Sequence, residues 1–180
     1  MKTVKDKLII KALIECISQK LTEQGFTSFE VSRSAQPTDQ YLGADIDSRI
    51  KTQIFLHQIS HKILQNAATE YKGEIESNRA VKVQIDCFHY YDIRDFDAFT
   101  PDDIAELISD MLFARDTIRC LREQGIRLES RTGIRPSFYI NDKEHFENVA
   151  SFDIVITYTN HRKTSNKHII GVNHNAISLD

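Results

Sequence analysis

The sequence predicts an α+β fold, in which two amphipathic helices pack on one face of a mainly antiparallel or mixed sheet. Residues 4–24 and 100–125 carry apolar side chains at the spacing of three and four that is typical of amphipathic helices. Several other segments alternate apolar and polar residues, as strands do. The order is helix, three strands, helix, three strands, which lacks the strict βαβ alternation of a parallel sheet. We expect residues 1–180 to form one domain.

The first helix, residues 4–24, has one apolar face and is expected to end at Gly25. That face comprises Leu8, Ile9, Leu13, Ile14, Ile17 and Leu21. Residues 26–35 alternate weakly and favour a strand. Residues 34–48 then collect Pro, Thr, Asp and Gly into a loop that is long for a plain connection.

Residues 50–64 are ambiguous by periodicity alone. Phe55, Ile59 and Ile63 lie four apart, as on a helix, yet they also fall on one face of a strand with His57 and His61. The content of Ile, Thr and Phe favours the strand. Residues 66–79 are polar and predict a turn region before the next strand.

Residues 81–87 alternate strictly and predict a strand with one buried face. The second helix is predicted to begin at Thr100, a cap residue, with Pro101 in its first turn and two aspartates near the positive end of the helix dipole. It is expected to continue to Gly125. Its predicted apolar stripe is Ile104, Leu107, Ile108, Met111, Leu112, Ile118 and Leu121.

Three further strands are predicted at residues 126–139, 151–159 and 169–177, and residues 160–180 form a polar C-terminal segment. The composition, 41% hydrophobic and 27% charged, is that of a globular protein. No stretch is apolar enough to cross a bilayer, and Lys11 and Glu15 interrupt a potential signal peptide, so we expect no membrane partner and no export.

The net charge of −3 and the mixture of basic with acidic residues predict no basic stripe for nucleic-acid recognition. Cys16, Cys87 and Cys120 are odd in number and widely spaced, which favours buried thiols in a reducing compartment over disulfides. A cysteine nucleophile paired with a distant histidine remains open, although such cysteines more often belong to the core.

Metal sites are poorly supported by the spacing of ligand residues. Asp86 with Glu74 and Lys82 is the one nuclease-like set, and it has no recognisable spacing. Cys87 and His89 share a strand face, but a zinc ion would need two further ligands. On a strand, His57 and His61 would lie about 13 Å apart, too far to share a metal. We therefore expect no bound metal and no cofactor.

An anion could bind near Arg131 and Arg135, which flank a glycine in "SRTGIRPSFY". The chain has neither GxxxxGK[ST] nor GxGxxG, so a nucleotide site is unsupported. Asp92, Asp95, Asp97, Asp102 and Asp103 fit a polar connection followed by a helix start. No catalytic residue is predicted, and we expect a binding or structural protein rather than an enzyme.

The order of local signatures nevertheless resembles a known family. "RSAQPTDQYLG" follows the first strand, "VKVQIDCFHYYD" leads into "FTPDDIAELISDMLFARDTIRCLREQGIRL", and "GIRPSFYINDKEHFENVASFDIVITYTN" follows. This order is similar to that of the phage neck or tail terminator family, which includes gateway, tail completion and head-to-tail joining proteins. Gln36, Pro37 and Thr38 before the strand at residues 50–64 match the family pattern, as do residues 146–154. The polar tail after residue 160 matches nothing.

The resemblance implies a structural virion subunit that forms a homo-oligomeric ring, commonly a hexamer, on the head-proximal end of a tail tube. Its implied partners are further copies of itself, the tail tube protein and the head connector or stopper protein. DNA would be passing cargo, because a ring of chains with net charge −3 attracts DNA weakly. The protein would fold in the host cytoplasm and reside in the virion neck.

The long loop, residues 34–48, is the predicted subunit interface. Three features favour this role: the loop is long, the strand that follows it is available for edge contacts, and the resembling family works as rings. The interface residues predicted within it are Gln36, Pro37, Thr38, Gln40, Tyr41 and Leu42. Two alternatives remain open: a metal-dependent nuclease or hydrolase, suggested by the Asp and His content, and a cellular α+β adaptor domain.

Overall fold

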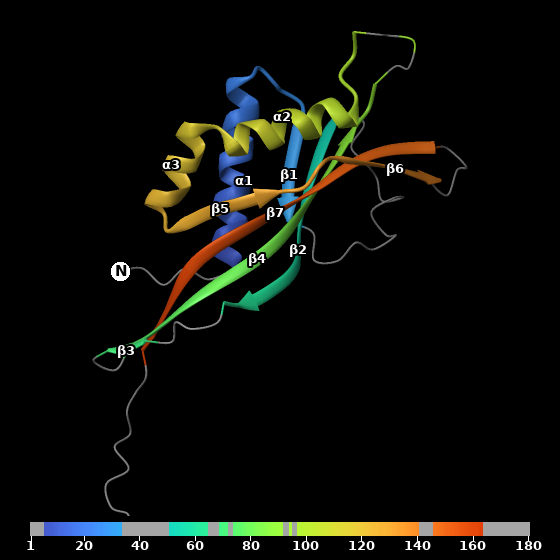
Figure 1. The fold of residues 1–180 in the computed structure, drawn as a ribbon. Coiled ribbons are helices and arrows are strands. Elements are labelled where there is room, and N and C mark those ends of the chain that lie inside the picture. The colour runs from blue at the N-terminus through green and yellow to red at the C-terminus, as the bar shows by residue number, and fades with distance from the viewer. Residues whose placement is uncertain are drawn as a thin grey trace, which may run out of the picture.

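A computed structural model describes residues 6–33, 51–64, 69–71, 74–91, 94, 97–140 and 146–163. Three helices and seven strands occur in these residues, which confirms the predicted α+β class (Figure 1). In chain order they are α1 (Asp6–Glu23), β1 (Phe29–Arg33), β2 (Thr52–Ile63), β3 (Thr69–Tyr71), β4 (Glu74–His89), α2 (Pro101–Phe113), α3 (Arg115–Glu123), β5 (Ile126–Arg131), β6 (Arg135–Ile140) and β7 (Phe146–Lys163).

The sheet is mixed but mostly antiparallel, with the order β1-β2-β4-β7-β5. β1 pairs with β2 in parallel, and the other strand pairs are antiparallel. β3 adds to β4, and β6 adds to β7. The longest pairing joins β4 to β7, from Glu74 opposite Lys163 to Phe88 opposite Val149. These two strands form the axis of the sheet and extend beyond the helices at the β3 end (Figure 1).

The core lies between the helices and one face of the sheet, because alternate strand residues point toward the helices. Figure 1 shows the three helices on one side of the sheet. The strand side of the core includes Ile54, Leu56, Val81, Val83, Ile85, Cys87, Phe152, Ile154 and Ile156, and the helix side includes Ile9, Leu13, Ile17, Leu21, Ile104, Ile108 and Leu112. The predicted alternation over residues 81–87 is therefore confirmed. The predicted apolar face of the first helix is confirmed for Ile9, Leu13, Ile17 and Leu21, whereas Ile14 is only partly buried and Leu8 is exposed.

The end of α1 depends on Gly25, as predicted. Gly25 has a φ of 86°, a left-handed conformation that glycine adopts without steric cost. The amide of Gly25 donates to the carbonyl of Thr22, and the amide of Phe26 donates to that of Leu21, both at 3.0 Å. This is the Schellman arrangement, which satisfies carbonyls that would otherwise lack partners at a helix end.

The start of α2 also agrees with the prediction. The Thr100 side chain accepts a hydrogen bond from the Asp103 amide at 3.2 Å, and the Asp103 carboxylate accepts one from the Thr100 amide at 2.8 Å. This capping box lies directly before Pro101. Hydrogen bonds from Thr100 lower the pKa of Asp103, whereas burial, followed by the neighbouring charge of Asp103, raises that of Asp102.

The single helix predicted from Thr100 to Gly125 is wrong, because the chain forms two helices separated at Ala114. In a continuous helix, each residue is rotated by about 100° from the one before it. Arg115, Arg119 and Arg122 would then point within about 60° of the direction of Ile104, which faces the core. Burying unpaired charges is costly. The extended conformation of Ala114, with φ −64° and ψ 146°, redirects α3.

The redirected helix buries a different set of side chains from the predicted one. In α3, Thr117 and Leu121 are buried, whereas Ile118, predicted as core, is only half-buried. Met111 is buried as predicted, and Leu107 packs at the edge of the core with part of its side chain exposed. The core prediction is therefore confirmed for Met111 and Leu121.

The strand predictions need three corrections. Most of the predicted polar turn at residues 66–79 belongs to β3 and β4, because β7 continues to pair with β4 as far as Glu74. The strand predicted at residues 126–139 is divided into β5 and β6, which pair with successive parts of β7. A bulge between Gln58 and Ser60 interrupts the alternation expected along β2. The strand predicted at residues 169–177 lies outside the described residues.

Replacement of Ile108 by Ala should lower the free energy of unfolding by about 2–5 kcal/mol, because the Ile108 side chain is fully buried between α2 and the sheet. The matched Leu107→Ala variant should cost clearly less, because Leu107 is partly exposed. Urea unfolding of both variants measures the difference. Equal losses would contradict the orientation of α2 described here.

Candidate functional site

The predicted interface residues Gln36, Pro37, Thr38, Gln40, Tyr41 and Leu42 lie outside the part of the chain that the structure describes. The same holds for residues 164–180 of the polar C-terminal segment. Their predicted roles therefore stay predictions.

The nuclease-like set of Asp86, Glu74 and Lys82 does not come together. Glu74 begins β4, about 40 Å along the strand from Asp86 at the usual rise per residue. Asp86 accepts a hydrogen bond from Gln84 and pairs with Nε2 of His57, both at 2.7 Å. Lys82 pairs with Asp153 instead.

The histidine and cysteine candidates are also separated. The bulge in β2 puts His57 and His61 on opposite faces of the sheet, so that His57 meets Asp86 and His61 lies 3.4 Å from the Tyr158 hydroxyl. The ring of His89 hydrogen-bonds to Thr52 at 2.8 Å, and burial, followed by the charge of Lys51, lowers its pKa. Cys87 lies beneath the helices, where burial raises the pKa of its thiol.

The other two cysteines lie where α1 and α3 meet. Burial, followed by the neighbouring Cys120, raises the pKa of Cys16 to about 11. Cys120 is exposed, unlike the buried thiol expected there. Within the described ranges, no three His, Cys, Asp or Glu residues gather as a metal site would require, and no helix is long and apolar enough to span a membrane.

A buried ion-pair cluster lies on the face of the sheet opposite the helices, and periodicity did not reveal it. The Asp153 side chain is only 2% exposed and accepts two hydrogen bonds from Arg135, at 2.6 and 3.1 Å. Lys82 pairs with the same carboxylate at 2.7 Å. Burial alone would raise the pKa of Asp153, but the hydrogen bonds from Arg135 and Lys82 outweigh it, and the pKa lies below its usual value. This cluster joins β4, β6 and β7.

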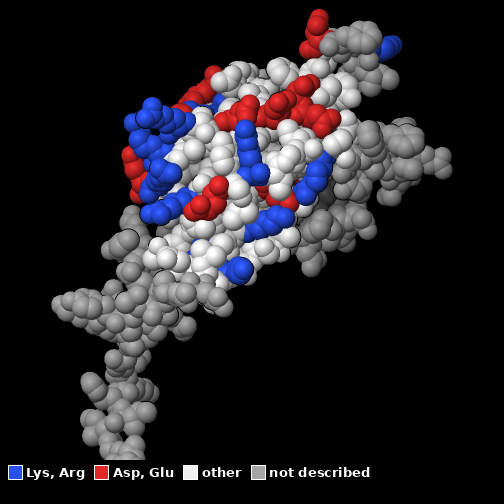
Figure 2. Space-filling view, viewed as in Figure 1, with Lys and Arg blue, Asp and Glu red and all other residues white. Residues whose placement is uncertain are grey.

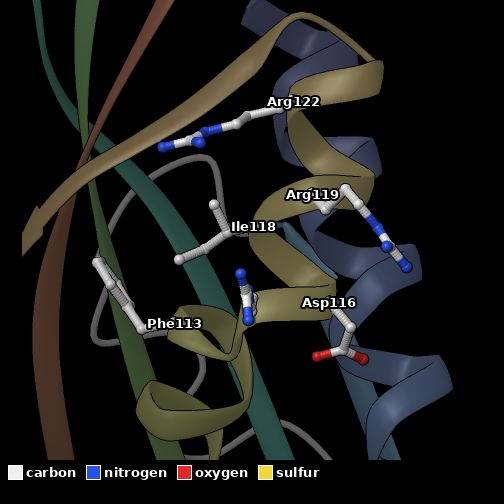
Figure 3. A pocket seen from close by; sticks show the side chains of 6 residues that line it. Phe113, Asp116, Ile118, Arg119 and Arg122 are labelled. Carbon is white, nitrogen blue, oxygen red and sulfur yellow. The ribbon is translucent and has the colours of Figure 1, made fainter.

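A recess in the described surface lies beside α3. It is a hollow of about 880 Å³, lined by Phe113, Arg115, Asp116, Ile118, Arg119 and Arg122. In Figure 3, Ile118 and Arg122 extend toward the Phe113 side of α3, whereas Arg119 and Asp116 extend from its other side. Figure 2 shows basic side chains gathered over α3 and acidic side chains along α2.

Two sets of contacts hold the walls of this hollow. Arg131 of β5 stacks over the Phe113 ring at 5.1 Å and donates hydrogen bonds to Ser109 and Asp110 at 2.8 and 2.7 Å. Lys20 of α1 pairs with Asp116 at 2.7 Å. Hydrogen bonding within this pair raises the pKa of Lys20 and lowers that of Asp116. Lys20 also pairs with Glu23 at 3.0 Å, so that Asp116 shares this cation with a second carboxylate.

The three arginines of α3 have no ion-pair partner among the residues that the structure describes, and all three are exposed. An unpaired guanidinium is a strong donor to carboxylate or phosphate groups. These arginines form a local basic cluster on a helix that also carries Asp116 and Glu123, and the prediction that the chain has no basic stripe for nucleic-acid recognition stays a prediction. The sequence did indicate that these arginines are exposed, because basic residues at 115, 119 and 122 would interrupt the apolar stripe of a continuous helix.

Comparison with known proteins gives one family. The family model described as E217 gateway protein gp29 matches residues 8–168. This match begins within α1 and ends beyond β7, so that it covers nearly the whole described fold. No curated protein matches the chain.

Replacement of Asp153 by Asn should lower the free energy of unfolding at pH 7 by about 1–3 kcal/mol, because Lys82 and Arg135 lose a buried partner but remain partly hydrated. The folded-state pKa of Asp153 is depressed, so its contribution is complete above the unfolded pKa of about 3.9 and disappears as the pH falls through the folded value. The difference between wild type and variant should therefore shrink in acid.

The matched control is Asp110→Asn, which breaks the exposed pair with Arg131 and should cost less than about 1 kcal/mol. Urea unfolding at several pH values measures both variants. A difference between wild type and Asp153→Asn that grows in acid would contradict the assigned ion pairs.

Proposed function

We infer the function of this chain from its family, because the chain belongs to the family of the E217 gateway protein gp29, a phage head–tail gateway family. The chain is a structural bacteriophage protein that joins head to tail in the virion. The family match over residues 8–168 carries this conclusion. It covers the helices, the central strands and the ion-pair cluster together, so the proposal applies to the whole fold rather than to one motif.

The working form in this proposal is a closed homo-oligomeric ring of six copies at the head-proximal end of the tail tube. One face of the ring contacts the tail tube protein, and the other contacts the head connector or stopper protein. The described sheet supports a ring because its order begins at β1 and ends at β5, two edges with different side chains. Contacts between unlike surfaces generate rings when the rotation between subunits closes.

DNA passes through this ring as cargo, without sequence recognition. The net charge of −3 per chain disfavours strong adhesion of DNA to the channel. The protein folds in the host cytoplasm, assembles into the virion neck and performs no catalysis. The ion-pair cluster around Asp153 then has a structural role, since it fastens β6 to the axis of the sheet.

The proposal predicts that phage particles made without this chain accumulate as separate heads and tails, and that the purified protein joins them. Joined particles are counted by electron microscopy after the two fractions are mixed. Separate heads and tails that join at the normal yield without the protein would contradict the proposal. Metal analysis and a DNA digestion assay on the same preparation test the alternative that the chain is a nuclease. The identities of the neighbouring genes test the alternative that it is a cellular adaptor domain.

A second prediction concerns the loop at residues 34–48. Deletion of residues 35–43 should prevent ring formation and joining, because the loop is the proposed subunit contact. Light scattering of the isolated protein, and of the protein bound to purified tails, measures the assembly state. Normal joining by the deleted protein would rule out an assembly role for the loop.

A further inference from the structure

The hollow beside α3 offers cationic donors to an anionic partner. Arg115, Arg119 and Arg122 line it without an ion-pair partner among the residues described, and Asp116 pairs with Lys20, which it shares with Glu23. Guanidinium groups bind carboxylates and phosphates through paired hydrogen bonds. A binding partner at this site should therefore present several negative charges within the length of one short helix.

The apolar part of the hollow favours a peptide over a nucleic-acid backbone. Phe113 and Ile118 line the hollow together with the arginines, and Figure 3 shows Ile118 extending toward the Phe113 side. A phosphate backbone presents no apolar side chains to such a surface, whereas a peptide can present carboxylates and apolar groups together. The occupant should thus combine aspartate or glutamate with apolar residues.

Residues 34–48 of this chain have that composition. They contain three aspartates, Asp39, Asp45 and Asp47, and no lysine or arginine. They also contain Tyr41, Leu42 and Ile46, which could cover Phe113 and Ile118. Both the charge and the apolar content of the segment therefore complement the hollow.

The positions of the two surfaces favour a contact between different copies. The segment leaves the sheet after β1 and returns at β2, whereas the hollow lies next to β5 at the other end of the strand order. These edges are four strand spacings apart, about 19 Å, and the helix layer adds about 10 Å. These two distances are perpendicular, so the straight separation is about 21 Å, whereas a segment of this length that leaves and returns reaches about 25 Å when fully extended. A contact within one chain would therefore need a nearly fully extended segment.

We propose that residues 34–48 of one copy dock into the arginine-lined hollow of the next copy, so that one subunit edge binds the opposite edge of its neighbour. This proposal rests on the ring in the proposed function and identifies both sides of its subunit contact. Contacts of this head-to-tail kind use two different surfaces on each subunit, and they close into a ring when the rotation divides a full turn.

Charge reversal tests each side of the contact. One variant carries Arg115→Glu and Arg122→Glu in the hollow, and the other carries Asp45→Arg and Asp47→Arg in the segment. Each variant alone should lose joined particles about tenfold or more, because like charges then face each other. The control is Arg127→Glu on β5, an exposed residue that does not line the hollow, and it should join normally. Circular dichroism verifies that every variant is folded.

Mixing the two defective variants in equal amounts gives the sharper result. Each interface of an alternating ring then pairs opposite charges, so a ring with an even number of copies should form and joining should recover. A contact within one chain cannot recover in this way. Variants that join like wild type would overturn the docking proposal and leave the proposed function standing, whereas failure of the wild-type protein itself would overturn both.

A third result would also overturn the docking proposal. The mixture could fail to recover while the hollow variant loses binding to double-stranded DNA in a salt-dependent assay. The arginines would then bind phosphate rather than a second copy of the chain.

Discussion

The antiparallel pairing of β4 with β7 is the constraint on which the rest of the structure depends. Its register fixes which side chains face the helices, and it thereby places Ile85 opposite Phe152 in the core. The same register puts Gln84 opposite Asp153 on the other face, where Lys82 and Arg135 meet the buried carboxylate. A slip of one residue would exchange these faces, burying charges under the helices and exposing the core. Both layers of the molecule therefore depend on one pairing.

The sequence predicted those parts of the fold that are governed by local chemistry. The capping box at Thr100, the left-handed Gly25 and the alternation along β4 each depend on residues close together in the chain. Periodicity failed where distant segments decide the structure. The polar start of β4 is a strand because β7 pairs with it, and the bulge near Ser60 depends on the register between β2 and β4.

The functional surface was less predictable than the fold. No local pattern indicated that Asp153 would meet Arg135, because their contact is made between two strands. The hollow beside α3 did have a signal, since Arg119 and Arg122 fall where a continuous helix would enter the core. The break at Ala114 resolves that conflict by turning the arginines to the surface. The cost of burying charge thus explains both the shape of the helix pair and the basic surface proposed as one half of a subunit contact.

The most direct test of the account is an electron cryo-microscopy map of the head–tail junction in intact particles, at a resolution that traces this chain. The account predicts a closed ring of copies between the tail tube and the head connector. In that ring, α3 of each copy lies against residues 34–48 of its neighbour. Absence of the chain from the junction would contradict the functional conclusion, and a ring in which α3 faces solvent would contradict the proposed contact.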